Sequence, residues 1–162
     1  MYLPRLLGVM ALPILGACAI LESSSGPGAG VIVTSTTTPL DLSLGDTARI
    51  TITVRNNGDF AVEVLAQQCN NDFFISGSDG NAYIPAEQVY CTLELKAPIN
   101  LSPGESVEIK AFTTGRVVPQ GSQDAPIMLS PGTYRVRPVI GVRSGDESAV
   151  LVSATPMMVT FR

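Results

Sequence analysis

The sequence predicts an all-β chain folded as an antiparallel β-sandwich, and three observations favour this class. Apolar and polar residues alternate in several short segments, which is the period of a half-buried strand. No segment has the 3.6-residue period of an amphipathic helix. Fifteen glycines and twelve prolines separate the alternating segments with turn residues, a spacing typical of sandwiches.

The clearest strand is expected at 47–55, which places four apolar side chains on one face: Ala48, Ile50, Ile52 and Val54. The turn residues Asn56-Asn57-Gly58-Asp59 follow, with Asn-Gly suited to positive φ. Alternation then resumes over 60–66, with Phe60, Val62, Val64 and Ala66 on the apolar face. The two segments together predict a β-hairpin.

Further strands are expected before and after this hairpin, at 31–34, 90–96, 106–111, 134–143 and 149–161. Pro138 predicts an edge or a bulge within its strand, and Pro156 interrupts the last strand. Two segments, Ser102-Pro103-Gly104 and Ser130-Pro131-Gly132, have proline followed by glycine. This order predicts a type II turn at each of them.

The first thirty residues are expected to direct export and to precede the folded domain. Arg5, an apolar run at 6–15 and the small residues Gly16-Ala17 follow the order of a secretory signal peptide, expected over 1–17. The apolar run is far shorter than the roughly 20 residues of a membrane-spanning helix. Residues 18–30 are rich in Ser, Gly and Pro, which predicts a flexible tether. The sandwich domain is then expected over 31–162.

The residues Leu15-Gly16-Ala17-Cys18 resemble the lipobox of bacterial lipoproteins. The resemblance implies that Cys18 becomes the acylated first residue and anchors the chain in membrane lipid, since each buried methylene contributes about 0.8 kcal/mol. Ala19 in place of aspartate implies the outer membrane, on its periplasmic or surface side, if the organism has one. The alternative is an ordinary secretory signal with an incidental cysteine.

The cysteine count agrees with an exported protein. Three cysteines would leave an unpaired thiol, but assigning Cys18 to lipid leaves Cys69 and Cys91 as an even pair. We expect a disulfide between them, whose loop of about 22 residues corresponds to roughly 3 kcal/mol of stabilisation. A redox-active pair would favour Cys-x-x-Cys spacing at a helix N-terminus. The spacing therefore favours a structural disulfide.

Composition excludes several functional classes. The net charge of −4 argues against nucleic-acid binding, which needs clustered cations. The absence of histidine removes the commonest general base and metal ligand. Lys96 and Lys110 are the remaining candidate bases, on strand faces expected to be exposed. We expect no enzymatic activity, no cofactor and no metal, and interpret five oxygen-bearing residues as turn formers: Asn70, Asn71, Asp72, Asp79 and Asn81.

Three features are candidate binding sites. The long gap between strands at 114–130 is expected to be a loop that exposes Arg116, Val117 and Val118. A second candidate is one strand face carrying Arg135, Arg137 and Arg143, which would bind an anionic partner or glycan, or be balanced by Glu108 on a neighbouring strand. The third is a set of aromatic residues near the cysteines, which would fill core or stack on a sugar: Phe73, Phe74, Tyr83 and Tyr90.

The turn residues resemble those of bacterial immunoglobulin-like envelope domains. Gly45-Asp46-Thr47 followed by Val54-Arg55-Asn56-Asn57-Gly58 is similar to the opening hairpin of CARDB-type adhesion modules. The segments Asp79-Gly80, Leu101-Ser102-Pro103-Gly104-Glu105-Ser106 and Leu129-Ser130-Pro131-Gly132-Thr133-Tyr134 resemble BsuPI-type proteinase inhibitors. The resemblance implies an immunoglobulin-like antiparallel β-sandwich of about seven to nine strands. This sequence departs from the inhibitors in lacking tryptophan and in carrying a cysteine pair and an export signal.

These observations favour a non-catalytic, lipid-anchored module of the cell envelope that binds or scaffolds an unidentified envelope protein. One alternative is an envelope-side proteinase inhibitor that uses the 114–130 loop. The other is a glycan-binding module.

Overall fold

The structure is a computed structural model that describes residues 28–43, 45–65, 73–78, 80–89, 97–122 and 124–162. Within these ranges the chain forms thirteen strands and one four-residue helical turn, α1 (Ala86–Val89). The prediction of an all-β sandwich is confirmed. The strand count exceeds the expected number because several strands are very short, such as β2 (Asp41–Leu42), β7 (Ile99–Leu101) and β10 (Ile127–Met128).

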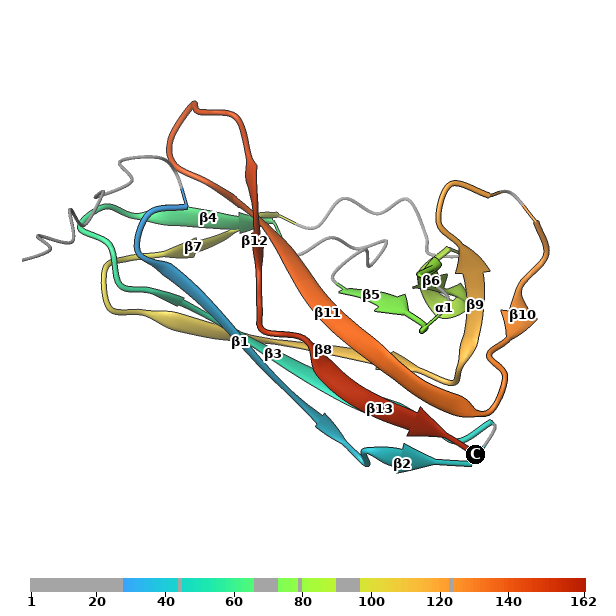
Figure 1. The fold of residues 1–162 in the computed structure, drawn as a ribbon. Coiled ribbons are helices and arrows are strands. Elements are labelled where there is room, and N and C mark those ends of the chain that lie inside the picture. The colour runs from blue at the N-terminus through green and yellow to red at the C-terminus, as the bar shows by residue number, and fades with distance from the viewer. Residues whose placement is uncertain (1–27, 44, 66–72, 79, 90–96, 123) are drawn as a thin grey trace, which may run out of the picture.

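One layer of the sandwich is a three-stranded antiparallel sheet, seen along the lower part of Figure 1. Its order is β1 (Val31–Thr38), β3 (Ala48–Asn56) and β8 (Ser106–Thr113). The strand expected at 47–55 is therefore present as β3. Its four inward side chains are at most 1% exposed, which confirms the predicted apolar face: Ala48, Ile50, Ile52 and Val54.

The other layer is organised around the twelve-residue strand β11 (Gly132–Arg143). The first part of β11 pairs with β5 (Phe73–Ser76) and β13 (Met157–Phe161), and its last part pairs with β12 (Val150–Ser153) and β4 (Val62–Leu65).

Two prolines mark the point where β11 changes partners. Pro138 is the last residue paired with β5, and its carbonyl accepts a hydrogen bond from the Ala154 amide at 3.1 Å. Pro156 lies between β12 and β13, as the sequence predicts. Pro138 therefore sits in a central strand at a change of partners and not at an edge of the sheet.

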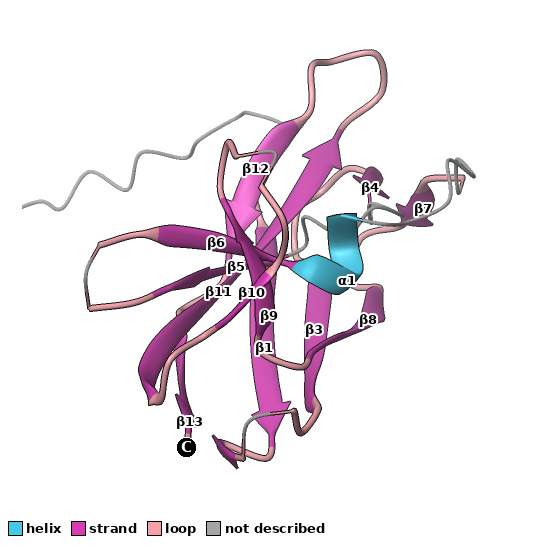
Figure 2. Cartoon of the chain, turned by 90° about the vertical axis from the view of Figure 1, so that its right-hand side faces the viewer, coloured by secondary structure: helices cyan, strands magenta, loops and turns pink. Residues whose placement is uncertain are grey.

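Further strands extend the second layer on both sides. β6 (Ala82–Pro85), β9 (Arg116–Pro119) and β10 follow β5 in order, and Figure 2 shows them beside α1. β7 pairs with β4. After the cis Thr38–Pro39 peptide bond, the chain leaves the first layer and β2 pairs in parallel with β13.

The inner faces of the two layers share one apolar core. β3 supplies its inward side chains, and the second layer contributes buried residues that include Val62, Val64, Phe73, Ile75, Val136, Ile140, Val142, Val159 and Phe161. Where a strand buries only alternate residues, its opposite residues face solvent, whereas residues 138–142 of β11 are buried on both sides.

The predicted hairpin between 47–55 and 60–66 is wrong. β3 pairs with β1 and β8, whereas β4 belongs to the other layer. The buried Asn56 side chain connects the layers: its Nδ2 donates to the carbonyls of Phe60 at 2.8 Å and Leu101 at 3.0 Å, and its Oδ1 accepts from the Gly58 amide at 3.0 Å. Phe60, expected on the apolar face, is 77% exposed.

The two Pro-Gly segments have different structures. The Glu105 amide donates to the Ser102 carbonyl at 3.0 Å and Gly104 has φ of +85°, as a type II turn requires. Gly132, in contrast, is the first residue of β11, so the second predicted turn is wrong. The Tyr134 hydroxyl there donates to the Ser130 carbonyl at 2.8 Å.

The folded domain begins before residue 31. The Val31 amide donates to the Gly28 carbonyl at 3.2 Å, and the Asn57 amide donates to the Gly30 carbonyl at 2.8 Å. A Cβ at Gly30, whose φ is +79°, would lie 2.6 Å from the Gly58 backbone, so this approach requires glycine. Residues 28–30, expected in the tether, therefore pack against the domain.

Candidate binding face

The outward side chains of β1, β3 and β8 form a polar surface, which we call the threonine face. Alternation places every second residue of each strand on this side of the sheet. The β-branched threonine side chain also favours extended backbone. The threonine face comprises Thr47, which directly precedes β3, and the strand residues Ile32, Thr34, Thr36, Thr38, Arg49, Thr51, Thr53, Arg55, Ser106, Glu108, Lys110 and Phe112.

Strand register places these side chains in rows across the sheet. Thr36 lies opposite Thr51, which lies opposite Lys110 on the other side. In the next row Thr38 lies opposite Arg49, and Arg49 lies opposite Phe112. Each of these rows therefore contains hydroxyl groups or an apolar ring beside one cation.

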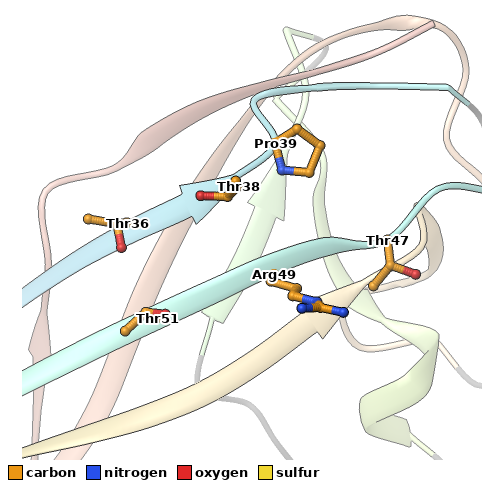
Figure 3. Close-up of a pocket in the computed structure, with 6 residues that line it drawn as sticks. All are labelled: Thr36, Thr38, Pro39, Thr47, Arg49 and Thr51. Carbon is orange, nitrogen blue, oxygen red and sulfur yellow. The ribbon is translucent and has the colours of Figure 1, made fainter.

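Two adjoining hollows lie where these rows end. The first, of about 500 Å³, is lined by β1, the start of β3 and the residue after β1 (Figure 3): Thr36, Thr38, Pro39, Thr47, Arg49 and Thr51. The second, of about 550 Å³, shares Thr47, Arg49 and Thr51 with the first and reaches Lys110 and Phe112. Arg49 thus lines both hollows.

The threonine face carries uncompensated positive charge. Lys110 Nζ donates to Glu108 Oε2 at 2.7 Å and to Thr51 Oγ1 at 3.2 Å, so this lysine is paired. Within the ranges that the structure describes, neither Arg49 nor Arg55 forms an ion pair. Each guanidinium offers five N–H donors, and carboxylate or phosphate groups match their geometry. The face can therefore bind an anionic group at Arg49.

The prediction that 114–130 forms one exposed binding loop is wrong. Arg116–Pro119 is strand β9, which pairs with β6 and β10. Val117 and Val118 are 0% and 4% exposed, whereas Arg116 is exposed. The segment is held at its start by Thr114, whose amide and hydroxyl donate to Glu87 of α1. The two valines fill core and cannot form an exposed binding segment.

The three arginines of β11 do not form one charged patch. Arg135 and Arg137 are exposed on the first part of the strand, opposite Ser76 and Phe74 of β5. Arg143, at the far end, is half-exposed and donates to Glu63 through Nε at 2.7 Å and through Nη2. The predicted partner Glu108 lies in the other layer. Arg143 therefore lies about 20 Å along the strand from Arg137 and is already paired.

The aromatic residues have different roles. Phe73 is fully buried in the core, as the core interpretation expects. Tyr83 lines a hollow of about 310 Å³ between the β5–β6 turn and residues 127–134, together with Ile127, Met128 and Tyr134. This hollow combines two tyrosines with backbone polar groups.

Several predicted residues lie outside the described ranges: Cys18, Cys69, Asn70, Asn71, Asp72, Asp79, Tyr90, Cys91 and Lys96. The disulfide and the lipidation therefore stay predictions. Among the residues that the structure does describe, no three His, Cys, Asp or Glu side chains gather as metal ligands. No helix in these same ranges is long and apolar enough to cross a membrane.

The threonine face as a site was not predicted from the sequence. Alternation at 47–55 places Thr47, Arg49, Thr51, Thr53 and Arg55 on one side of a strand, and this part could be inferred. Which strands flank it depends on pairing between distant segments. The run Thr34-Ser35-Thr36-Thr37-Thr38 beside it was the available signal.

No family model matches the sequence, and no curated protein matches it. Among solved structures, the Northeast Structural Genomics Consortium target SoR45 is 10% identical with a TM-score of 0.46, over 82% of this chain and 87% of that one. An Escherichia coli alpha-2-macroglobulin structure spanning domain MG7 to the C-terminus is 15% identical with a TM-score of 0.45, over 86% and 17%. A Pseudomonas fluorescens alkylpurine DNA glycosylase is 15% identical with a TM-score of 0.43, over 82% and 30%. This chain thus spans less than a third of the latter two proteins.

Proposed function

We propose that this chain is a lipid-anchored, non-catalytic module of the cell envelope that binds an acidic protein segment through its threonine face. The lipobox-like residues ending at Cys18 support the anchor. The observation that carries the binding role is Arg49, which lines two adjoining hollows and has no ion pair within the described ranges.

The chemistry of the face favours a carboxylate-bearing partner. Arg49 can donate two parallel hydrogen bonds to one carboxylate, a geometry that adds both strength and orientation. The hydroxyls of Thr36, Thr38 and Thr51 can donate or accept beside it. Phe112, 48% exposed, offers an apolar contact at the rim of the second hollow.

Local charge also suits this face to an acidic partner. The chain as a whole carries −4, whereas this face has an excess of positive charge. The threonine face carries three cations, Arg49, Arg55 and Lys110, against one carboxylate, Glu108. This asymmetry orients an acidic partner toward the face.

The expected tether fits a module that captures a partner near a membrane. The expected tether between Cys18 and Gly28 has nine residues, and a flexible chain of this length has a root-mean-square reach of roughly 15–18 Å. Because residues 28–30 pack on the domain, the tether would end at the start of β1, one edge of the sheet that carries the threonine face.

A glycan-binding role is the second candidate, and the hollow lined by Tyr83 and Tyr134 favours it. Aromatic rings beside polar backbone groups are suited to stacking on sugars and bonding their hydroxyls. The proteinase-inhibitor alternative loses its proposed reactive segment, because Val117 and Val118 are buried.

Titration with a short oligoglutamate peptide tests the proposed face. We expect the unaltered protein to bind the peptide, and Arg49→Gln to weaken binding about tenfold, since a charge-assisted hydrogen bond contributes about 1.5–3 kcal/mol. Arg135→Gln is the matched control, because it removes the same charge from an exposed position on the other layer. Isothermal titration calorimetry at low salt measures both, since salt screens such contacts.

Absence of peptide binding, or an equal loss in both arginine variants, would contradict the assignment. Binding of a neutral oligosaccharide that Tyr83→Ala abolishes would instead favour the glycan-binding candidate.

A further inference from the structure

The edge of the threonine face formed by β1 has none of the usual protection against strand pairing. Among the described strands, β1 pairs with β3 alone. Beyond Val31, whose amide donates to the Gly28 carbonyl, the other side of β1 therefore has no strand partner in the described ranges. Natural edge strands are commonly protected by a charge, a proline or a bulge. β1 has eight residues and contains neither charge nor proline, whereas β8, the opposite edge, carries Glu108 and Lys110.

Two buried hydroxyl groups on the same strand have no hydrogen-bond partner within the described part of the chain. They are Ser35 Oγ and Thr37 Oγ1. Both belong to the inward side of β1, in line with Val31 and Val33. Buried polar groups in native proteins nearly always have a partner, so these two require an explanation.

We propose that β1 pairs antiparallel with β1 of a second copy of this chain, which joins two three-stranded sheets into one of six strands. A two-fold axis at Thr36 places Thr36 of one copy opposite Thr36 of the other. The same register places Ser35 of each copy opposite Thr37 of the other.

This register gives both buried hydroxyls a partner. Directly opposite residues in an antiparallel pair have Cβ atoms about 4.5–5.5 Å apart, a separation across which serine and threonine form hydrogen bonds. Rotation about the Cα–Cβ bond turns each hydroxyl toward the strand edge. The symmetry repeats the Ser35–Thr37 contact twice, as an isologous interface requires.

A second copy fits this edge because the strand is compatible with itself. On the outward side the register pairs threonine with threonine, Thr34 opposite Thr38 and Thr36 opposite Thr36, so no like charges meet. Arg49 lies on β3, beside Thr38, so each copy keeps its guanidinium one strand away from the seam. The dimer would therefore present two threonine faces on one continuous sheet.

This inference is independent of the proposed function, because it rests on β1 and requires neither the lipid anchor nor an acidic partner. Sedimentation equilibrium of the full chain, in detergent matched to the solvent density, tests it. We expect a concentration-dependent mass that reaches twice that of the single chain.

The variant Thr36→Lys places two like charges opposite each other and is expected to weaken the dimer at least about tenfold. Thr53→Lys is the matched control, since Thr53 lies on the same face of the central strand, opposite Glu108, and should leave association unchanged. Thermal unfolding by circular dichroism checks that both variants fold.

A monomer at all concentrations would overturn the proposal. A dimer that persists in folded Thr36→Lys, or that Thr53→Lys weakens equally, would overturn it as well.

Discussion

Replacing Phe161 with alanine is expected to lower the free energy of unfolding by about 3–5 kcal/mol. The side chain is 1% exposed and lies in the shared core of the two layers. Its ring packs edge-on against Tyr134, with centroids 5.8 Å apart, and faces Gly115, where a Cβ would lie 3.0 Å from Phe161 Cε1. Because domains are stable by only about 5–15 kcal/mol, chemical denaturation should show a large loss.

Phe60→Ala is the matched control for this change. Phe60 is 77% exposed, so its removal is expected to change stability by no more than about 0.5 kcal/mol. The sequence pattern places Phe60 on the apolar face, whereas the structure places it in solvent. Equal losses for the two phenylalanine variants would contradict the core described here.

Asn56→Ala is expected to destabilise the domain by about 2–4 kcal/mol, because each buried polar group left unpaired costs about 1–3 kcal/mol. The asparagine is fully buried and its side chain makes three hydrogen bonds, to Phe60, Leu101 and Gly58. Two of these bonds satisfy carbonyl oxygens where the chain crosses between layers. Urea unfolding of the variant measures the loss.

The neighbouring Asn57→Ala provides the comparison for Asn56. Asn57 is exposed, and its interaction with Gly30 uses the backbone amide, which alanine retains. Its replacement should leave stability within about 0.5 kcal/mol. If both asparagine variants unfolded at the same urea concentration, the Asn56 side chain would not stabilise the segment that crosses between the two layers.

Local periodicity predicted the strands correctly where one face is buried and the other polar. The alternation of Ala48, Ile50, Ile52 and Val54 sufficed to identify β3 and its inner face. Pro156 likewise separated β12 from β13. These features depend on neighbouring residues, so the sequence contains the information directly.

Pairing between distant segments was not predictable from the same patterns. Asn56-Asn57-Gly58 has the composition of a hairpin turn, yet the Asn56 side chain bonds Leu101, 45 residues away, and the chain crosses between layers. A buried asparagine and an exposed turn asparagine look alike in sequence, because Asn serves both roles.

The predictions of the candidate sites were wrong for the same reason, because they too depend on contacts between distant segments. Two adjacent valines at 117 and 118 show no alternation, so the strand β9 was interpreted as a loop. Arg143 contacts Glu63, which is 80 residues away in the sequence, so Arg143 does not belong to the expected arginine patch. Predicting the threonine face would have required the pairing register of β1, β3 and β8. Alternation within a single strand does not specify that register.

The intact mass of the protein purified from its native membrane is the most direct test of the proposal that this chain is a lipid-anchored module. We expect a chain that begins at Cys18 and carries acyl groups, and we expect the Cys18→Ser variant to lose that added mass and leave the membrane fraction. An unacylated chain, cleaved at another position, would contradict the anchor and would leave three thiols in an exported protein.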